Sequence, residues 1–272
     1  MRAGIYLDNS STTPVDERVM EAMTAVFREN FGNASSVHLF GQEARRTVDE
    51  ARRSVAELLG TEAHEIVFTS GGTESNNWAL WGVLRGGDRP GNHIITTAIE
   101  HPAVLNTCKA MKDAGAEVAV VPVDDSGRVD PADIEEAVRE NTILISVMHA
   151  NNETGVIQPI EKISEIARRH GVLLHTDAVQ STGKIPVKVN ELGVDLLSLS
   201  AHKFHGPKGV GVLYIRKGTR LAPLITGGSQ ERKRRAGTEN VPAIAGLGVA
   251  ARLAEERLPE LKTRVAGLRD RL

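Results

Sequence analysis

Seven short apolar runs, each the length of a β-strand and rich in Val and Ile, recur along the chain with helical patterns between them. This alternation is typical of an α/β domain. The runs have apolar residues on both faces, which indicates buried strands, as in a mostly parallel sheet with helices on each side. We expect strands at EIVFTS (65–70), HIITTA (93–98), EVAVVPV (117–123), TILISVM (142–148), VLLHTDA (172–178), DLLSLSA (195–201) and VGVLYIR (210–216).

The segments between these runs have apolar residues at helical spacing and, in two cases, a clear stop signal. The pattern over 37–60 ends at Gly60, and the pattern over 160–171 ends at Gly171. A shorter helix is expected over 132–140.

One last helical pattern runs from residue 243 to 272 without a cap or a stop signal. Its leucines need a surface to pack against. Either the fold continues beyond this chain, or the helix frays or self-associates, and the sequence leaves both open. The leucines are Leu247, Leu253, Leu258, Leu261 and Leu268.

Charge and composition exclude several classes of protein. The chain has 33 Lys and Arg against 35 Asp and Glu, a net charge of −2, so no strong field favours nucleic acid or an anionic membrane surface. No apolar run reaches the roughly 18 residues of a membrane span, and the first residues lack a signal-peptide core. We therefore expect a soluble, cytoplasmic protein. With Cys108 as the one cysteine, neither an internal disulfide framework nor a multi-cysteine zinc site is expected.

Polar clusters directly follow five of the expected strands. Open α/β sheets bind ligands beyond the carboxyl ends of their strands, so these clusters predict a ligand site at that edge. The clusters are SGGTESNN (70–77), EHPAV (100–104), HANNETG (149–155), HTDAVQ (175–180) and SAHKFHGPKG (200–209).

The first cluster suits a phosphate group. Gly71 and Gly72 allow the backbone to approach an anion, Thr73 offers a hydroxyl and an N–H, and a helix starting at about Thr73 would direct its positive end at the group. The alternative is an ordinary glycine turn with a threonine cap. The segment is not a P-loop, because no G-x-x-x-x-G-K-[ST] pattern occurs.

Two later clusters carry a carboxylate and a lysine. Asp177 at a strand end is either a helix cap, a metal ligand, or the partner of a protonated ring nitrogen as in pyridoxal phosphate chemistry. Lys203 is either a solvated lysine or a Schiff-base nucleophile whose pKa is lowered by burial and by neighbouring positive charge. His202 and His205 have no acidic or cysteine ligand at regular spacing, so no metal site is expected.

Eight motifs, taken in order and spacing, resemble those of the cysteine desulfurases, a family of class V pyridoxal-phosphate enzymes. The resemblance implies a fold-type I large domain with a seven-stranded, mainly parallel sheet and helices on both faces, working as a homodimer. It also implies that 1–15 belongs to the small domain, that 16–258 forms the large domain, and that 259–272 leads to a C-terminal small domain absent from this chain. The motifs are YLDNSSTTPVD, FGNASSVH, SGGTESNN, EHPAV, HANNETG, HTDAVQSTGK, SAHKFHGPKGVGVLY and RRAGTEN.

The resemblance also implies residue roles. Lys203 matches the lysine that forms the Schiff base with pyridoxal 5'-phosphate, and His101 matches the histidine that stacks on the ring and assists acid–base steps. Asp177 matches the carboxylate that pairs with the ring nitrogen. The other implied cofactor contacts are Gln180 at the phenolic oxygen, Asn152 beside the cofactor, Gly72, Thr73, Ser200 and His202 at the phosphate, and Thr238 at the phosphate of the partner subunit.

The implied reaction removes sulfur from L-cysteine, giving L-alanine and a persulfide for a sulfur-acceptor protein such as an iron–sulfur scaffold or a tRNA-thiolation protein. In the family, the persulfide-forming cysteine and the arginine that binds the substrate carboxylate lie in the C-terminal small domain, and neither is expected here. Cys108 is instead interpreted as a small packed residue. Ala34 stands where the family commonly has proline.

Two alternatives stay open. The chain is a cofactor-binding or partner-binding protein without desulfurase turnover, or it is a related class V lyase or aminotransferase that acts without a cysteine nucleophile. The retained Lys203, His101, Asp177 and Gln180 favour catalysis. The missing cysteine and arginine favour the first alternative, and the desulfurase-like motifs weigh against the second.

Overall fold

A single seven-stranded sheet forms the centre of the computed structural model, which describes residues 4–228 and 230–271. Each strand lies within a run predicted from the sequence, so all seven predictions are confirmed. Across the sheet the order is β1-β7-β6-β5-β4-β2-β3. The strands are β1 (Ile66–Thr69), β2 (His93–Thr97), β3 (Glu117–Val121), β4 (Thr142–Ser146), β5 (Leu173–Asp177), β6 (Leu196–Ser200) and β7 (Gly211–Ile215).

Strand direction makes one edge of the sheet the natural place for a site. β6, β5, β4, β2 and β3 run parallel, and β7 alone is antiparallel to both of its neighbours, β1 and β6. The mainly parallel sheet is therefore confirmed. Because β7 is reversed, its first residue Gly211 pairs with the last residues of β1 and β6, Thr69 and Ser200. The predicted clusters that follow β1, β2, β4, β5 and β6 consequently meet at this edge.

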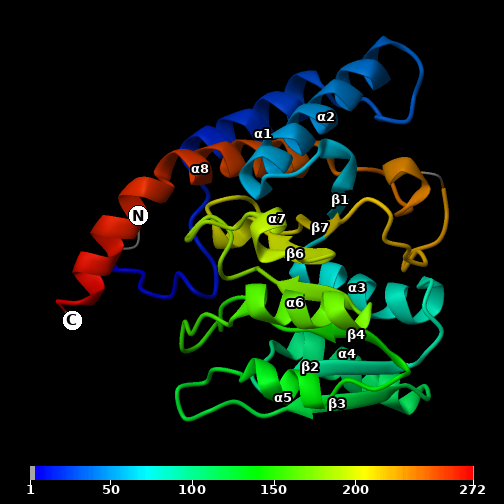
Figure 1. Ribbon diagram of the computed structural model, residues 1–272. Coiled ribbons are helices and arrows are strands. Elements are labelled where there is room, and N and C mark those ends of the chain that lie inside the picture. The colour runs from blue at the N-terminus through cyan, green and yellow to red at the C-terminus, as the bar shows by residue number, and fades with distance from the viewer. Residues whose placement is uncertain (1–3, 229, 272) are drawn as a thin grey trace.

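Helices cover both faces of the sheet, as expected (Figure 1). On one face α3 and α4 bury Trp78 and Met111, and on the other α2, α5, α6 and α7 bury residues such as Leu59 and Ile163. The helices are α1 (Glu17–Glu29), α2 (Leu39–Leu59), α3 (Gly72–Gly86), α4 (Pro102–Asp113), α5 (Pro131–Glu136), α6 (Ile160–His170), α7 (Val189–Leu192) and α8 (Val241–Arg269), with single 3-10 turns at Ala63–Glu65, Ala201–Lys203 and Glu231–Lys233.

The predicted helix ends follow from local chemistry. Gly60 and Gly171 adopt the left-handed conformation that ends α2 and α6, with φ of 66° and 62°. The pattern over 132–140 is helical only to Glu136, because the Arg139 N–H then donates to the Thr142 hydroxyl (2.7 Å) as the chain turns into β4.

The last helix, α8, packs its first half on α1 and α2, which gives the leucines there the surface they need. Leu247 and Leu253 are buried, whereas Leu268 further along is 47% exposed, and the final turns extend past the sheet (Figure 1). Leu272 lies outside the described residues. The helix continues through Pro259 without a break, so the division of the chain at residue 258 stays a prediction. No helix in the described part of the chain has the length and hydropathy of a membrane span.

Candidate functional site

A cavity of about 460 Å³ lies at the carboxyl edge of the sheet. Its lining includes nine of the ten residues predicted for the site. Thr238 is the exception, since it is exposed on the loop before α8 and does not line this cavity. The lining residues are Asp8, Ser10, Ser11, Gly72, Thr73, Asn76, His101, Met148, Asn152, Glu153, Asp177, Val179, Gln180, Ser200, His202 and Lys203.

The turn from β1 into α3 brings backbone N–H groups to the cavity. A Cβ on Gly72 would lie 2.6 Å from the Val179 side chain, and a Cβ on Gly211 would lie 2.6 Å from Cα of Gly71. Glycine is therefore required for the turn to pack this closely against β7. The N-cap of α3 is Gly71, without a side-chain cap bond, so the alternative of a cap by Thr73 is wrong. An N-terminal turn open to a cavity attracts an anion.

Asp177, at the end of β5, is a buried carboxylate. Oδ2 accepts from Nδ2 of Asn76 (2.6 Å) and Oδ1 accepts from the Val179 N–H (2.9 Å). Burial raises the pKa of Asp177, although these two bonds and the charges of His101 and Lys203 oppose the rise. Oδ1 of Asn76 is buried without a hydrogen-bond partner among the described residues. No helix begins at Asp177, so the interpretation as a helix cap is wrong.

Lys203 follows β6, and its Nζ donates to the carbonyl oxygens of Ser10 (2.6 Å) and Ser11 (2.8 Å). Burial lowers the pKa of Lys203, while the carboxylates of Asp177 and Asp8 raise it. Burial acts as the sequence analysis expected. Positive charge also lies near it, because the charge of Lys203 lowers the pKa of Lys184 and the repulsion between two cations is mutual.

His101 is the N-cap of α4, where its Nδ1 accepts from the Ala103 N–H (3.0 Å). A neutral ring with Nδ1 as acceptor carries its proton on Nε2. Before it, the buried Glu100 accepts at Oε1 from the Thr97 hydroxyl (2.6 Å) and the Met148 N–H (2.9 Å). Burial raises the pKa of Glu100 to about 8. Glu100 thereby ties the loop that carries His101 to the end of β4.

Gln180 and Asn152 lie on loops fixed by neighbouring polar groups. Gln180 donates from Nε2 to the Ser10 carbonyl (2.8 Å) and accepts at Oε1 from Nζ of Lys184 (2.7 Å). Asn152 donates to Glu153 (2.6 Å), and the turn that carries both is held by Asn151, whose side-chain oxygen accepts two backbone N–H groups at 2.9 Å.

The two histidines of the lysine loop hold the N-terminal segment. Nδ1 of His202 lies 3.1 Å from the Thr12 hydroxyl, and Nδ1 of His205 lies 3.0 Å from the Pro14 carbonyl. The described residues contain no group of three or more His, Cys, Asp or Glu side chains that could hold a metal ion.

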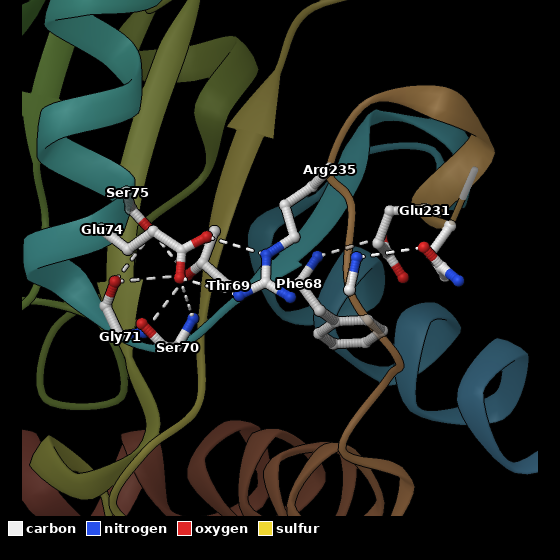
Figure 2. A network of polar contacts seen from close by, with 10 residues as sticks. Phe68, Thr69, Ser70, Gly71, Glu74, Ser75, Glu231 and Arg235 are labelled. Carbon is white, nitrogen blue, oxygen red and sulfur yellow. Dashed lines mark hydrogen bonds and ion pairs between the residues drawn. The ribbon is translucent and has the colours of Figure 1, made fainter. Parts of the chain in front are cut away.

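The loop before α8 is joined to the start of α3 by one ion pair (Figure 2). Arg235 donates to both oxygens of Glu74 (2.9 and 3.1 Å), and Glu74 also accepts from the Ser70 N–H (2.8 Å). On the same loop, the buried Glu231 accepts from the guanidinium of Arg52 through both oxygens (2.8 and 2.9 Å) and from the Phe68 N–H (3.1 Å).

Sequence reasoning missed Asn76, Glu100 and Lys184. Asn76 lies one turn after Gly72 on α3, Glu100 is the first residue of EHPAV, and Lys184 lies four residues after Gln180 in HTDAVQSTGK. All three therefore stood inside quoted motifs. Spacing alone did not distinguish them from solvated residues.

The site combines a glycine-lined turn with a lysine and a buried carboxylate at one edge of the sheet. A comparison of the chain with known protein families identifies the class to which it belongs. Aminotransferase class-V matches residues 5–264, and the chain belongs to this family.

Similar proteins narrow the class to the cysteine desulfurases. The chain is 54% identical over 270 residues to "Cysteine desulfurase IscS" of Dictyoglomus turgidum, covering 99% of this chain and 68% of that protein. Among solved structures, "NIFS-LIKE PROTEIN" is 49% identical with a TM-score of 0.91, covering 94% of this chain and 71% of the other. "SspA in complex with cysteine" is 42% identical with a TM-score of 0.88, covering 91% and 72%. The resemblance, the fold class and the enzyme class read from the sequence are thus confirmed.

Proposed function

We propose that this chain binds pyridoxal 5'-phosphate in the 460 Å³ cavity and uses it to remove sulfur from L-cysteine, as a cytoplasmic homodimer that passes the sulfur to an acceptor protein. One observation carries the proposal. A buried carboxylate, Asp177, and a lysine with a lowered pKa, Lys203, line the same cavity as a glycine-lined helix start.

The donors and acceptors of the cavity fit this cofactor. Asp177 offers a buried acceptor whose pKa is raised by burial, and a protonated pyridine nitrogen would give it a cationic partner. Oδ1 of Asn76, which is buried and has no hydrogen-bond partner within residues 4–228 and 230–271, offers a further acceptor nearby. The phosphate would be held by Gly72 and Thr73 at the start of α3, together with Ser200 and His202.

When bound, the cofactor supplies an electron sink that makes bonds of the attached amino acid labile. The protein's own groups move the protons. Lys203, with its pKa lowered by burial, acts as the amine nucleophile and proton carrier. His101 is held by its Nδ1 bond so that Nε2 is available for proton transfer. Asp177 keeps the ring nitrogen protonated.

The sulfur is not taken up by Cys108. Its side chain is 2% exposed in the core between α3, α4 and the sheet, and burial raises the pKa of its thiol to about 12. A buried thiol of that pKa is a poor nucleophile.

Thr238 supports the homodimer. It is exposed on a loop fixed by the Arg235–Glu74 pair, and it does not line its own chain's cavity. We assign it to the phosphate of the partner subunit's cofactor.

Reconstitution of the full chain with pyridoxal 5'-phosphate tests the proposal. We expect visible absorption, and after borohydride reduction a mass tag at Lys203. Lys203→Ala should abolish both, and Cys108→Ser should change neither. A colourless protein, or a tag on another lysine, would contradict the proposal.

Substrate chemistry is tested separately by adding L-cysteine and following absorption and sulfide. Asp177→Asn should keep the cofactor but weaken the spectral response, because the ring nitrogen loses its charged partner. A response equal to that of the unchanged chain would show that Asp177 has another role.

A further inference from the structure

The side-chain amide of Gln180 has a donor end and an acceptor end, and only one of them suits the proposed site. A cofactor oxygen needs an N–H, whereas the opposite orientation would place the amide oxygen against it. The orientation of this amide therefore decides whether Gln180 attracts or repels the group it faces.

Lys184 imposes one orientation. Its Nζ donates to Oε1 of Gln180 at 2.7 Å, and an ammonium group has no acceptor, so the amide oxygen must face it. On the other side, Nε2 of Gln180 donates to the Ser10 carbonyl at 2.8 Å, and a carbonyl has no donor. Both neighbours impose the same orientation, with the NH₂ group toward the cavity.

The backbone around Lys184 is itself fixed. Gly183 has a φ of 76°, and a Cβ there would lie 2.7 Å from Cβ of Phe204, the residue after Lys203. The Lys184 N–H donates to the Ser181 carbonyl at 3.0 Å. The turn is thus packed directly against the loop that carries Lys203, and Lys184 has little freedom to move away.

Lys184 is also a strong enough donor for this role. Burial, with a contribution from the charge of Lys203, lowers its pKa to about 8. At neutral pH most of the population still carries the charge.

We propose that Lys184 is a positioning residue that holds the Gln180 amide with its N–H toward the cavity, ready to donate to an oxygen of the bound cofactor. This inference rests on the proposed function. In this structure the Ser10 carbonyl accepts the hydrogen bond from the Gln180 NH₂ group. The hydrogen bond from Lys184 to the Gln180 oxygen does not depend on which acceptor the NH₂ group faces.

The test is the dissociation constant of pyridoxal 5'-phosphate for the full chain, measured by titration, with the absorption spectrum of the bound cofactor at fixed pH. We expect Lys184→Met to weaken binding by about 3- to 10-fold, the usual effect of one hydrogen bond, and to change the spectrum. Lys184→Arg, which still donates, should restore both. Lys162→Met removes an exposed lysine of α6 and should leave both unchanged.

A double-mutant cycle separates positioning from a general effect of charge. If Lys184 acts through Gln180, then Lys184→Met should change nothing further in a chain that already carries Gln180→Ala. An equal loss in both backgrounds would show that Lys184 acts on the cavity by its charge alone and would overturn the proposal. So would a Lys184→Met chain that matches the unchanged chain while Gln180→Ala is weakened.

Two further outcomes are distinguishable. If Gln180→Ala has no effect on affinity or spectrum, the cofactor contact assigned to Gln180 fails, and the role of Lys184 fails with it. If no variant or parent chain binds the cofactor, the proposed function fails. Should Lys184→Met leave the cofactor-free chain unfolded at the assay temperature, Lys184→Gln replaces it, since an amide donates or accepts and no longer forces one orientation.

Discussion

Glu100 gives the sharpest prediction for stability, because it is a buried carboxyl group tied to two donors. Glu100→Gln keeps an oxygen for the Thr97 hydroxyl and the Met148 N–H. Its new NH₂ group takes the place of Oε2, which is buried without a partner among the described residues. The protonated carboxyl group has an unpaired donor there too, so the exchange itself should cost no more than about 1 kcal/mol.

The effect of Glu100 should depend on pH. Burial raises its pKa from 4.5 to about 8, so between these values the folded chain holds a proton that the unfolded chain has released. The stability it contributes is fully present below the unfolded pKa and is lost as pH rises through the folded pKa. In this window the free energy of unfolding falls by up to about 1.4 kcal/mol per pH unit through this one group.

Urea unfolding of the cofactor-free full chain, repeated from about pH 5 to about pH 8, measures this effect. Glutamine does not titrate, so the difference in unfolding free energy between Glu100→Gln and the unchanged chain should grow with pH, by roughly 4 kcal/mol across the range. Glu165→Gln, an exposed change on α6, should follow the unchanged chain. A difference that stays constant with pH would show that Glu100 is not a buried, raised-pKa group.

Three further changes test the packing around the site. Arg52→Met leaves the buried Glu231 carboxylate without its cation and should cost about 3–5 kcal/mol in urea unfolding, and a loss under about 1 kcal/mol would contradict this. Gly211→Ala places a Cβ 2.6 Å from Gly71 and should weaken pyridoxal 5'-phosphate binding by about tenfold in a titration, so unchanged affinity would argue against the turn as the phosphate site. Burial lowers the pKa of His175 from 6.5 to about 3. The stability that the neutral histidine contributes is therefore fully present above pH 6.5 and is lost as the pH falls toward 3. His175→Gln should consequently lose less free energy of unfolding in acid than the unchanged chain does.

Much of the fold follows from local pattern. The seven strands are short runs rich in Val, Ile and Leu, and six of them are almost fully buried between helix layers. The edge strand β3 differs from the expectation of burial on both faces, because it has a neighbour on one side only and leaves Val120 51% exposed. The glycine stops at Gly60 and Gly171 follow from the left-handed conformation alone. The predicted cavity residues meet because the carboxyl ends of parallel strands share one edge, which is a property of the sheet and requires no knowledge of side-chain contacts.

The supporting residues could not be predicted, because their roles depend on burial and on contacts distant in sequence. In the sequence Glu100 is indistinguishable from an ordinary acidic residue, because its hydrogen bond from the Met148 N–H appears only in the folded chain. Asn76 contacts Asp177 across 101 residues, and the pairing has no sequence period. The charges that act on Lys203 have the same origin, since Asp177, Asp8 and Lys184 are all distant from it in sequence.

The loop before α8 links this chain's proposed phosphate site with the residue proposed for the partner subunit's phosphate. Glu231 and the two residues after it have positive φ, from 42° to 68°, a backbone conformation that costs roughly 1–3 kcal/mol per residue outside glycine. The buried pair with Arg52 offsets that strain and fixes the start of the loop. Further along the loop, Arg235 forms an ion pair with Glu74, and the same carboxylate accepts a hydrogen bond from the Ser70 N–H (Figure 2). The Glu74 carboxylate therefore holds both the turn that would bind one phosphate and the loop that would present Thr238 to the partner's phosphate. A shift of the turn should move the loop, and a shift of the loop should move the turn.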